Sequence, residues 1–152
     1  MSSGIGQHEN DKRWMRAALA EARKAEGRTG TNPPVGCVLI SPDNKLIAAG
    51  HTMPNGRPHA EAVALAEAGS AGMAHRVVGG TAYVTLEPCQ MCAGASYWTQ
   101  IGKIVYGASE LDRGFVNLNT KLHPKTKVVQ GILETECSVL IKRFFIEKRN
   151  LN

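Results

Sequence analysis

The sequence predicts an α/β fold, a three-layer α/β/α sandwich in which helices cover both faces of a β-sheet. Helix-forming segments alternate along the chain with short apolar runs rich in β-branched and aromatic residues, which is typical of a sheet packed between helices. The chain of 152 residues is also long enough to bury one core but short for two. We therefore expect residues 1–152 to form a single domain.

The first elements are expected to be a helix and an antiparallel hairpin. Residues 11–27 place Trp14 and several alanines at helical intervals among charges, and Gly27 ends this pattern. The apolar runs 35–40 and 46–50 flank the turn sequence SPDNK, which favours a hairpin of two antiparallel strands.

The later segments alternate between helix and strand. Proline is well tolerated at the first helical position, so Pro88 is expected to end a strand and to open a helix. The expected elements are a helix over 59–69, a strand over 80–87, a helix over 88–102, a strand over 103–108, a short strand over 127–131 and a terminal helix over 132–150. Residues 109–126 are polar and are expected to be irregular.

The composition favours a cytoplasmic protein with no membrane partner. No apolar run approaches the roughly 20 residues that a bilayer crossing needs, and residues 1–14 contain no apolar stretch that would act as a secretion signal. In a reducing cytosol the four cysteines are not a disulfide framework. The close pair Cys89 and Cys92 therefore predicts a metal site or a redox pair.

The charge balance favours anionic partners. The chain has 18 Lys and Arg against 13 Asp and Glu, a net charge of +5, which suits phosphates or nucleic acid. The terminal sequence KRFFIEKR has two interpretations. It is either a basic, aromatic surface for RNA or a helix that buries Phe144 and Phe145 and solvates its charges, and the second is the more common arrangement.

The sequences RPHAE and PCQMC together predict a zinc site. Cys89 and Cys92 are three residues apart, so at the start of a helix both thiols lie on one face and can bind one ion. His59 supplies a third ligand, and a catalytic zinc site leaves its fourth position to water. We place the ion between the N-termini of two helices, where Glu61 in the first turn can reach that water.

The charge of this ligand set explains why a carboxylate is needed. Two thiolates and a neutral imidazole cancel the charge of the dication, so the bound water is less acidic than in an all-histidine site. Glu61 would take a proton from this water, pass it to a ring nitrogen of the substrate and protonate the departing ammonia.

Histidine-x-glutamate followed by proline-cysteine-x-x-cysteine is the pattern of zinc-dependent base deaminases, and the chain resembles the cytidine and deoxycytidylate deaminase superfamily. The resemblance implies a central five-stranded mixed sheet between helices. It also implies hydrolytic removal of an amino group from a nucleobase, nucleoside or nucleotide, a Zn²⁺ cofactor and a homodimer.

Different segments resemble different members of this superfamily. RWMRAALAEARKA, YVTLEPCQMCAGA, IGKIVYGASE and VVQGILETECSVLIKRFF are similar to bacterial tRNA adenosine deaminases and to guanine deaminases. GRTGTNPPVGCVLI and MPNGRPHAEAVALAEAG are similar to the riboflavin-pathway deaminase, which acts on an aminopyrimidine ribose phosphate. The first group covers more of the chain, so the favoured substrate is a tRNA adenosine or a purine, and the riboflavin precursor is the alternative.

Each family pattern departs from this chain at one place. The riboflavin enzyme usually has several residues inserted between its zinc cysteines, whereas Cys89 and Cys92 are separated by two. The tRNA enzyme usually has an asparagine soon after its second strand, whereas this chain has His51 there and Asn55 four residues later.

The resemblance also assigns substrate-binding residues. Asn32 and His51 match polar positions of the substrate pocket in the riboflavin-type motif. The backbone N–H of Ala60 and the backbone around Glu87 are expected to border the base, as they do in the superfamily.

Two other kinds of protein fit part of the pattern. In a noncatalytic zinc module for nucleic-acid or protein binding, Cys37 or Cys137 would fill the fourth position and Glu61 would have no role. A thiol redox pair at Cys89 would require neither His59 nor Glu61.

Overall fold

The structure, a computed structural model, describes residues 4–151 and the side chains of residues 6–149. A five-stranded sheet in the order β2-β1-β3-β4-β5 forms its centre, as expected. The strands are β1 (Gly36–Ile40), β2 (Leu46–His51), β3 (Thr81–Leu86), β4 (Lys103–Ala108) and β5 (Lys127–Gln130). The sheet is mixed, because β1 pairs antiparallel with β2 and β3, whereas β3, β4 and β5 are parallel.

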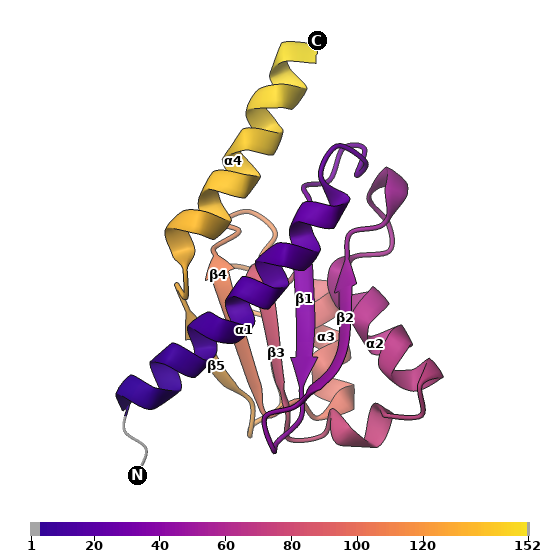
Figure 1. Cartoon of the computed structure of the whole chain (residues 1–152), viewed down its shortest axis with the longest axis vertical. Coiled ribbons are helices and arrows are strands. Elements are labelled where there is room, and N and C mark those ends of the chain that lie inside the picture. Colours follow the sequence, from indigo (N-terminus) through magenta and orange to yellow (C-terminus); the bar gives the residue numbers. More distant parts are fainter. Residues whose placement is uncertain (1–3, 152) are drawn as a thin grey trace.

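Helices cover both faces of the sheet, which confirms the predicted sandwich (Figure 1). On one face α1 (Gly4–Ala25) and α4 (Glu134–Leu151) pack over a core that includes Met15, Tyr83 and Val105. On the other face α2 (Ala60–Ser70) and α3 (Gln90–Thr99) enclose a second core. Successive side chains along each strand point to opposite faces of the sheet, so each strand contributes to both cores. None of these described helices has the length and apolarity that a membrane crossing requires.

The strand directions gather several loops at one edge of the sheet. Because β1 runs opposite to its neighbours, the loop entering β1 lies at the same edge as the loops leaving β2, β3 and β4. These loops hold residues 29–35, 52–59, 87–89 and 109–126. Segments distant in the sequence therefore meet at this edge, and α2 and α3 begin there.

Two glycines allow the helices to approach the sheet closely. A Cβ at Gly36 would lie 1.9 Å from the Ala18 carbonyl oxygen of α1, and a Cβ at Gly50 would lie 2.6 Å from the Ala60 carbonyl oxygen of α2. Neither distance is compatible with a side chain. The first turn of α2, which carries the predicted site residues, is thus seated directly on β2.

Three helix boundaries differ from the expected ones. α1 begins at Gly4 and not at residue 11; its polar first turns are linked to neighbouring groups by hydrogen bonds such as Gln7 to Asp11. α3 begins after Cys89 and ends at Thr99, because Gln100 adopts a left-handed conformation with φ of 56°. α4 begins at Glu134, after a left-handed Leu133.

The second half of α4 projects beyond the sheet (Figure 1). Phe145 and Ile146 are 43% and 49% exposed, and Phe144 is only partly buried. The expectation that this helix buries both phenylalanines is therefore wrong, because only the first half of α4 packs on β4 and β3 and the second half extends past the edge of the sheet. Arg143 pairs with Glu26 just after α1, and Lys148 lies over the ring of Phe144.

Candidate zinc site

The predicted zinc ligands converge from the N-termini of two helices. His59 is the N-cap residue of α2 and Cys89 is the N-cap residue of α3, while Cys92 is the third residue of α3. Both caps have extended backbone and are followed directly by helix, so the sequence places the imidazole and the thiols at helix ends that favour negative charge.

The distances among the three donor atoms fit a tetrahedral zinc ion. His59 Nδ1 lies 3.6 Å from Cys89 Sγ and 3.7 Å from Cys92 Sγ. A Zn–S bond of about 2.3 Å and a Zn–N bond of about 2.0 Å in a tetrahedron put sulfur and nitrogen about 3.5 Å apart. All three donor atoms lie within 4.8 Å of one another. One imidazole and two thiols are also the donor chemistry that zinc prefers.

The two thiols share a proton unequally. A hydrogen bond from Cys92 lowers the pKa of Cys89 to about 5, and the same hydrogen bond raises the pKa of Cys92. The site therefore favours the thiolate form of Cys89. Because thiolates are the species that ligate zinc, a dication at this site would draw the remaining proton from Cys92.

Glu61 lies in the first turn of α2, on the wall of the pocket in front of the ligands. Its side chain also borders a small inner cavity together with Cys37 and Cys92. Burial raises the pKa of the Glu61 carboxyl to about 7. This carboxyl group is therefore close to the ligands and able to exchange a proton near neutral pH, and a bound dication would lower its pKa.

The other two cysteines do not complete the ligand set. Among the described residues the metal-ligating group consists of His59, Cys89 and Cys92 alone. Cys37 is fully buried in β1 and burial raises the pKa of its thiol. Cys137 lies on α4 in the core on the opposite face of the sheet. The arrangement leaves one position for a non-protein ligand, as in catalytic and not structural zinc sites.

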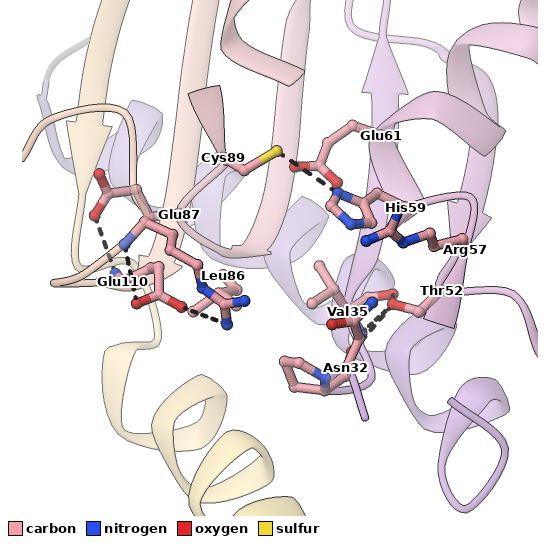
Figure 2. Close-up of a pocket in the computed structure, with 13 residues that line it drawn as sticks. Asn32, Val35, Thr52, Arg57, His59, Glu61, Leu86, Glu87, Cys89 and Glu110 are labelled. Carbon is pink, nitrogen blue, oxygen red and sulfur yellow. Dashed lines mark hydrogen bonds and ion pairs between the residues drawn. The ribbon is translucent and has the colours of Figure 1, made fainter. Parts of the chain in front are cut away.

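A pocket of about 170 Å³ opens in front of the zinc ligands (Figure 2). Of the residues predicted to bind substrate, Asn32, Ala60 and Glu87 line it. Asn32 donates from Nδ2 to the Gly56 carbonyl oxygen, which fixes its amide and leaves Oδ1 as an acceptor. Ala60 is the first residue of α2, where backbone N–H groups have no partner within the helix.

His51 is not among the pocket residues, so the structure does not support its predicted contact with substrate. Gly50 faces α2, and the next residue of the strand therefore faces α1. There His51 Nδ1 lies 3.1 Å from Glu21 Oε1. The match of His51 to a pocket position of the riboflavin-type motif could not show that its side chain points toward α1.

Glu87 organises the loop on one side of the pocket. It is buried, and its two carboxylate oxygens accept hydrogen bonds from the backbone N–H groups of Glu110 and Val116, at 3.1 and 2.9 Å. The same loop is bound to the start of α3 by the Cys89–Gly114 bridge. Glu87 is thus a positioning residue for the loop beside Cys89.

Four further polar residues of the pocket were not predicted: Thr52, Arg57, Glu110 and Arg113. Thr52 ties the loop after β2 to the loop before β1, because its hydroxyl accepts from the Val35 N–H at 2.9 Å. Arg57 belongs to the RPHAE motif, two residues before His59, and this closeness in sequence could have placed it at the pocket. Glu110 and Arg113 lie in an irregular segment that carries no sequence periodicity.

Comparison with known proteins identifies similar sequences. The profile of the cytidine and deoxycytidylate deaminase zinc-binding region matches residues 8–108. The tRNA-specific adenosine deaminase of Bacillus subtilis is 37% identical over an alignment of 149 positions, and the match covers 91% of this chain and 91% of that protein.

Solved structures of two kinds are similar to this one. The bifunctional diaminohydroxyphosphoribosylaminopyrimidine deaminase and 5-amino-6-(5-phosphoribosylamino)uracil reductase of Thermotoga maritima superposes with a TM-score of 0.78 at 30% identity. That match covers 91% of this chain but 41% of the bifunctional protein, so the chain spans about two fifths of it. A tRNA:A34 deaminase studied for A-to-I editing at the wobble position superposes with a TM-score of 0.70 at 31% identity, covering 84% of this chain and 98% of that one.

Proposed function

The chain belongs to the cytidine and deoxycytidylate deaminase zinc-binding family and is a zinc-dependent hydrolytic deaminase, and on this premise we propose that its substrate is an adenosine of tRNA. The observation that carries the proposal is the 37% identity to a tRNA-specific adenosine deaminase across 91% of both chains. Inosine and ammonia are the expected products.

The shape and charge of the molecule support an RNA substrate. α4 starts at the edge of the sheet where the pocket opens and projects past it (Figure 1). Its outer half presents Phe145 and Ile146 together with Lys148 and Arg149. Exposed aromatic and basic side chains on one element combine stacking on bases with neutralisation of phosphates.

We assign the proton transfers of the reaction to Glu61. A zinc ion held by His59, Cys89 and Cys92 supplies an activated water as the nucleophile. Glu61 takes up a proton and delivers it to the ring nitrogen beside the amine-bearing carbon. Glu61 then takes the remaining proton from the added hydroxyl group and places it on the amino nitrogen. The carbon–nitrogen bond breaks, ammonia leaves, and the carbon retains the oxygen as a carbonyl.

Asn32 and Ala60 are proposed to hold the base. Asn32 Oδ1 is a fixed acceptor in the pocket wall, and the Ala60 N–H is a free donor at the start of α2. Together they offer one acceptor and one donor to the polar edge of a planar ring.

A riboflavin-pathway aminopyrimidine nucleotide is the second candidate substrate. The higher TM-score of 0.78 to the Thermotoga maritima enzyme favours it, as does the position of Asn32 in the pocket. The x-x spacing of the zinc cysteines and the stronger sequence match over the whole chain favour the tRNA substrate.

We further propose that residues 1–152 act as one cytoplasmic deaminase domain that assembles as a homodimer. Large apolar side chains are exposed on α3 and on the adjoining loop: Met91, Trp98, Leu111, Val116 and Leu118. A set of this size is uncommon on a monomer surface and suits contact with a second copy.

Ammonia release from a panel of substrates tests the proposal. The zinc-loaded protein is incubated with adenine, guanine, cytosine, their nucleosides and nucleotides, the aminopyrimidine ribose phosphate, and tRNA isolated from cells that lack tRNA deaminase activity. Inosine formed at an anticodon adenosine, read by sequencing of the tRNA, supports the proposal. Turnover of a small molecule with no conversion of the tRNA overturns it.

A further inference from the structure

The pocket in front of the zinc ligands is large enough for a base but not for a whole nucleotide. Its volume is about 170 Å³. A cavity of about 150 Å³ holds a benzene molecule, and a water in the liquid occupies about 30 Å³. A base whose amino group points at Glu61 therefore fills the pocket. The ribose and any phosphate attached to it must lie at the opening.

One side of the opening carries Arg57. Its side chain is exposed, and no carboxylate pairs with it in the part of the chain that the structure describes. The loop on both sides of it is held in place, because the Asn55 N–H donates to the Arg28 carbonyl oxygen at 3.1 Å and the Met53 N–H donates to the Pro58 carbonyl oxygen at 3.2 Å. Figure 2 shows Arg57 beside His59 at this edge of the pocket.

Another wall carries Arg113, which comes from a different segment of the chain. Its side chain is 65% exposed, and its closest carboxylate oxygen is Glu110 Oε2 at a loose 3.6 Å. The turn that holds it is fixed, because Glu87 accepts from the Glu110 N–H and the Gly114 N–H donates to the Glu110 carbonyl oxygen. A surface pair of this kind is worth little, so the guanidinium is available to another anion.

We infer that Arg57 and Arg113 bind the phosphate groups next to the base that occupies the pocket. Guanidinium groups bind phosphate oxygens through paired, charge-assisted hydrogen bonds. The backbone around both arginines is fixed, Arg57 has no carboxylate partner among the described residues, and Arg113 has only the loose pair with Glu110. Both side chains are exposed and line the pocket, so they lie at the opening where a base in the pocket leaves its sugar. The enzyme therefore selects a phosphorylated substrate over the free base or nucleoside. This inference rests on the proposed deaminase site and narrows its substrate class.

Kinetics with Arg57→Gln and Arg113→Gln test the inference. The zinc-loaded proteins are assayed on an anticodon stem-loop RNA, on adenosine monophosphate and on adenosine, and binding of the stem-loop is measured separately by fluorescence anisotropy. Arg16→Gln is the matched control, because Arg16 is exposed on α1 and does not line the pocket. Thermal melts of all variants establish that each one is folded.

Each pocket variant is expected to raise KM and Kd for the phosphorylated substrate roughly tenfold, with a much smaller change in KM for adenosine. The slope of log Kd against log salt concentration should fall by about 0.7 to 1 for the stem-loop. A change with the stem-loop alone identifies phosphodiesters as the ligand, and an equal change with adenosine monophosphate identifies a 5′-phosphate.

Unchanged Kd values and salt slopes in both variants would overturn the inference while leaving the deaminase proposal intact. Equal losses on adenosine and on the phosphorylated substrates would also overturn it. If the wild-type protein deaminates none of the three substrates, the tRNA proposal fails, and the anisotropy data still decide whether the arginines bind phosphate.

Discussion

The Nδ1 atom of His59 lies 3.6 Å from the Sγ atom of Cys89, although 30 residues separate the two in the sequence. Each residue caps a different helix, and both helices begin at the same edge of the sheet. This single contact joins the two halves of the sequence motif. It also sets the position of the pocket, since Glu61 and Cys92 follow their caps within one turn.

Glu61→Gln should strongly reduce deamination while leaving zinc bound. The amide cannot take up and deliver the proton, so kcat should fall by a factor of about 10² to 10⁴. Ammonia release measures activity, and elemental analysis measures zinc. Glu67→Gln, an exposed change on the same helix, is the control and should behave as the wild type. Retained activity in Glu61→Gln would remove Glu61 from the proposed chemistry.

Cys92→Ala should weaken zinc binding by more than about 100-fold, because loss of an outer-shell partner alone costs 10- to 100-fold. Cys37→Ala is the matched control: Cys37 is buried but is not part of the ligand group. Competition with a coloured chelator gives the two affinities. Equal zinc loss in both variants would mean that Cys37 is a fourth ligand, which would make the site a structural one.

Gly50→Ala should destabilise the protein by about 1–3 kcal/mol. Its Cβ would lie 2.6 Å from the Ala60 carbonyl oxygen, which must move the turn that carries His59 and Glu61. Zinc affinity should therefore fall as well. Urea denaturation of the zinc-loaded protein gives the free energy of unfolding. Gly69→Ala is the control. Gly69 lies in α2 with open space around it, so this change should be neutral or stabilising by up to about 1 kcal/mol.

Glu87→Gln should loosen the loop that carries Arg113. The amide NH₂ cannot accept a hydrogen bond, so either the Glu110 or the Val116 N–H loses its acceptor. Hydrogen exchange at these two amides should accelerate, and KM for RNA should rise more than kcat falls. Glu136→Gln, an exposed change on α4, serves as the control. Unchanged exchange at both amides would contradict the positioning role.

Trp98→Glu should convert the proposed homodimer to a monomer. Trp98 is 83% exposed, and Met91 two turns earlier on the same face of α3 is 66% exposed. A buried charge in place of the indole would oppose association. Light scattering after size exclusion gives the molar mass. Leu46→Glu, at an exposed position on β2, should leave the mass unchanged. A wild-type protein that is monomeric at high micromolar concentration would end the dimer proposal.

The sequence alone determined the ligand chemistry of the site. Cys89 and Cys92 are three residues apart at a helix start, and such local spacing fixes relative side-chain positions without any knowledge of the fold. The hairpin, the helices that carry the motifs and the alternation that defines the sandwich also depend on short-range patterns. The five strands were predicted from apolar runs, and the family resemblance implied that they form one mixed sheet; the structure confirms both.

Only the tertiary structure decided which other side chains reach the pocket. The direction of His51 depends on which helix covers each face of β2. Gly50 contacts α2 on one face, and His51 points to the other face, toward Glu21 of α1. Arg113 lies in an irregular loop that two hydrogen bonds to Glu87 hold beside Cys89. The exposure of Phe145 depends on how far α4 extends past the edge of the sheet, where it no longer packs on β4 and β3. Local patterns fix what a segment can form, whereas contacts between distant segments fix where its side chains point.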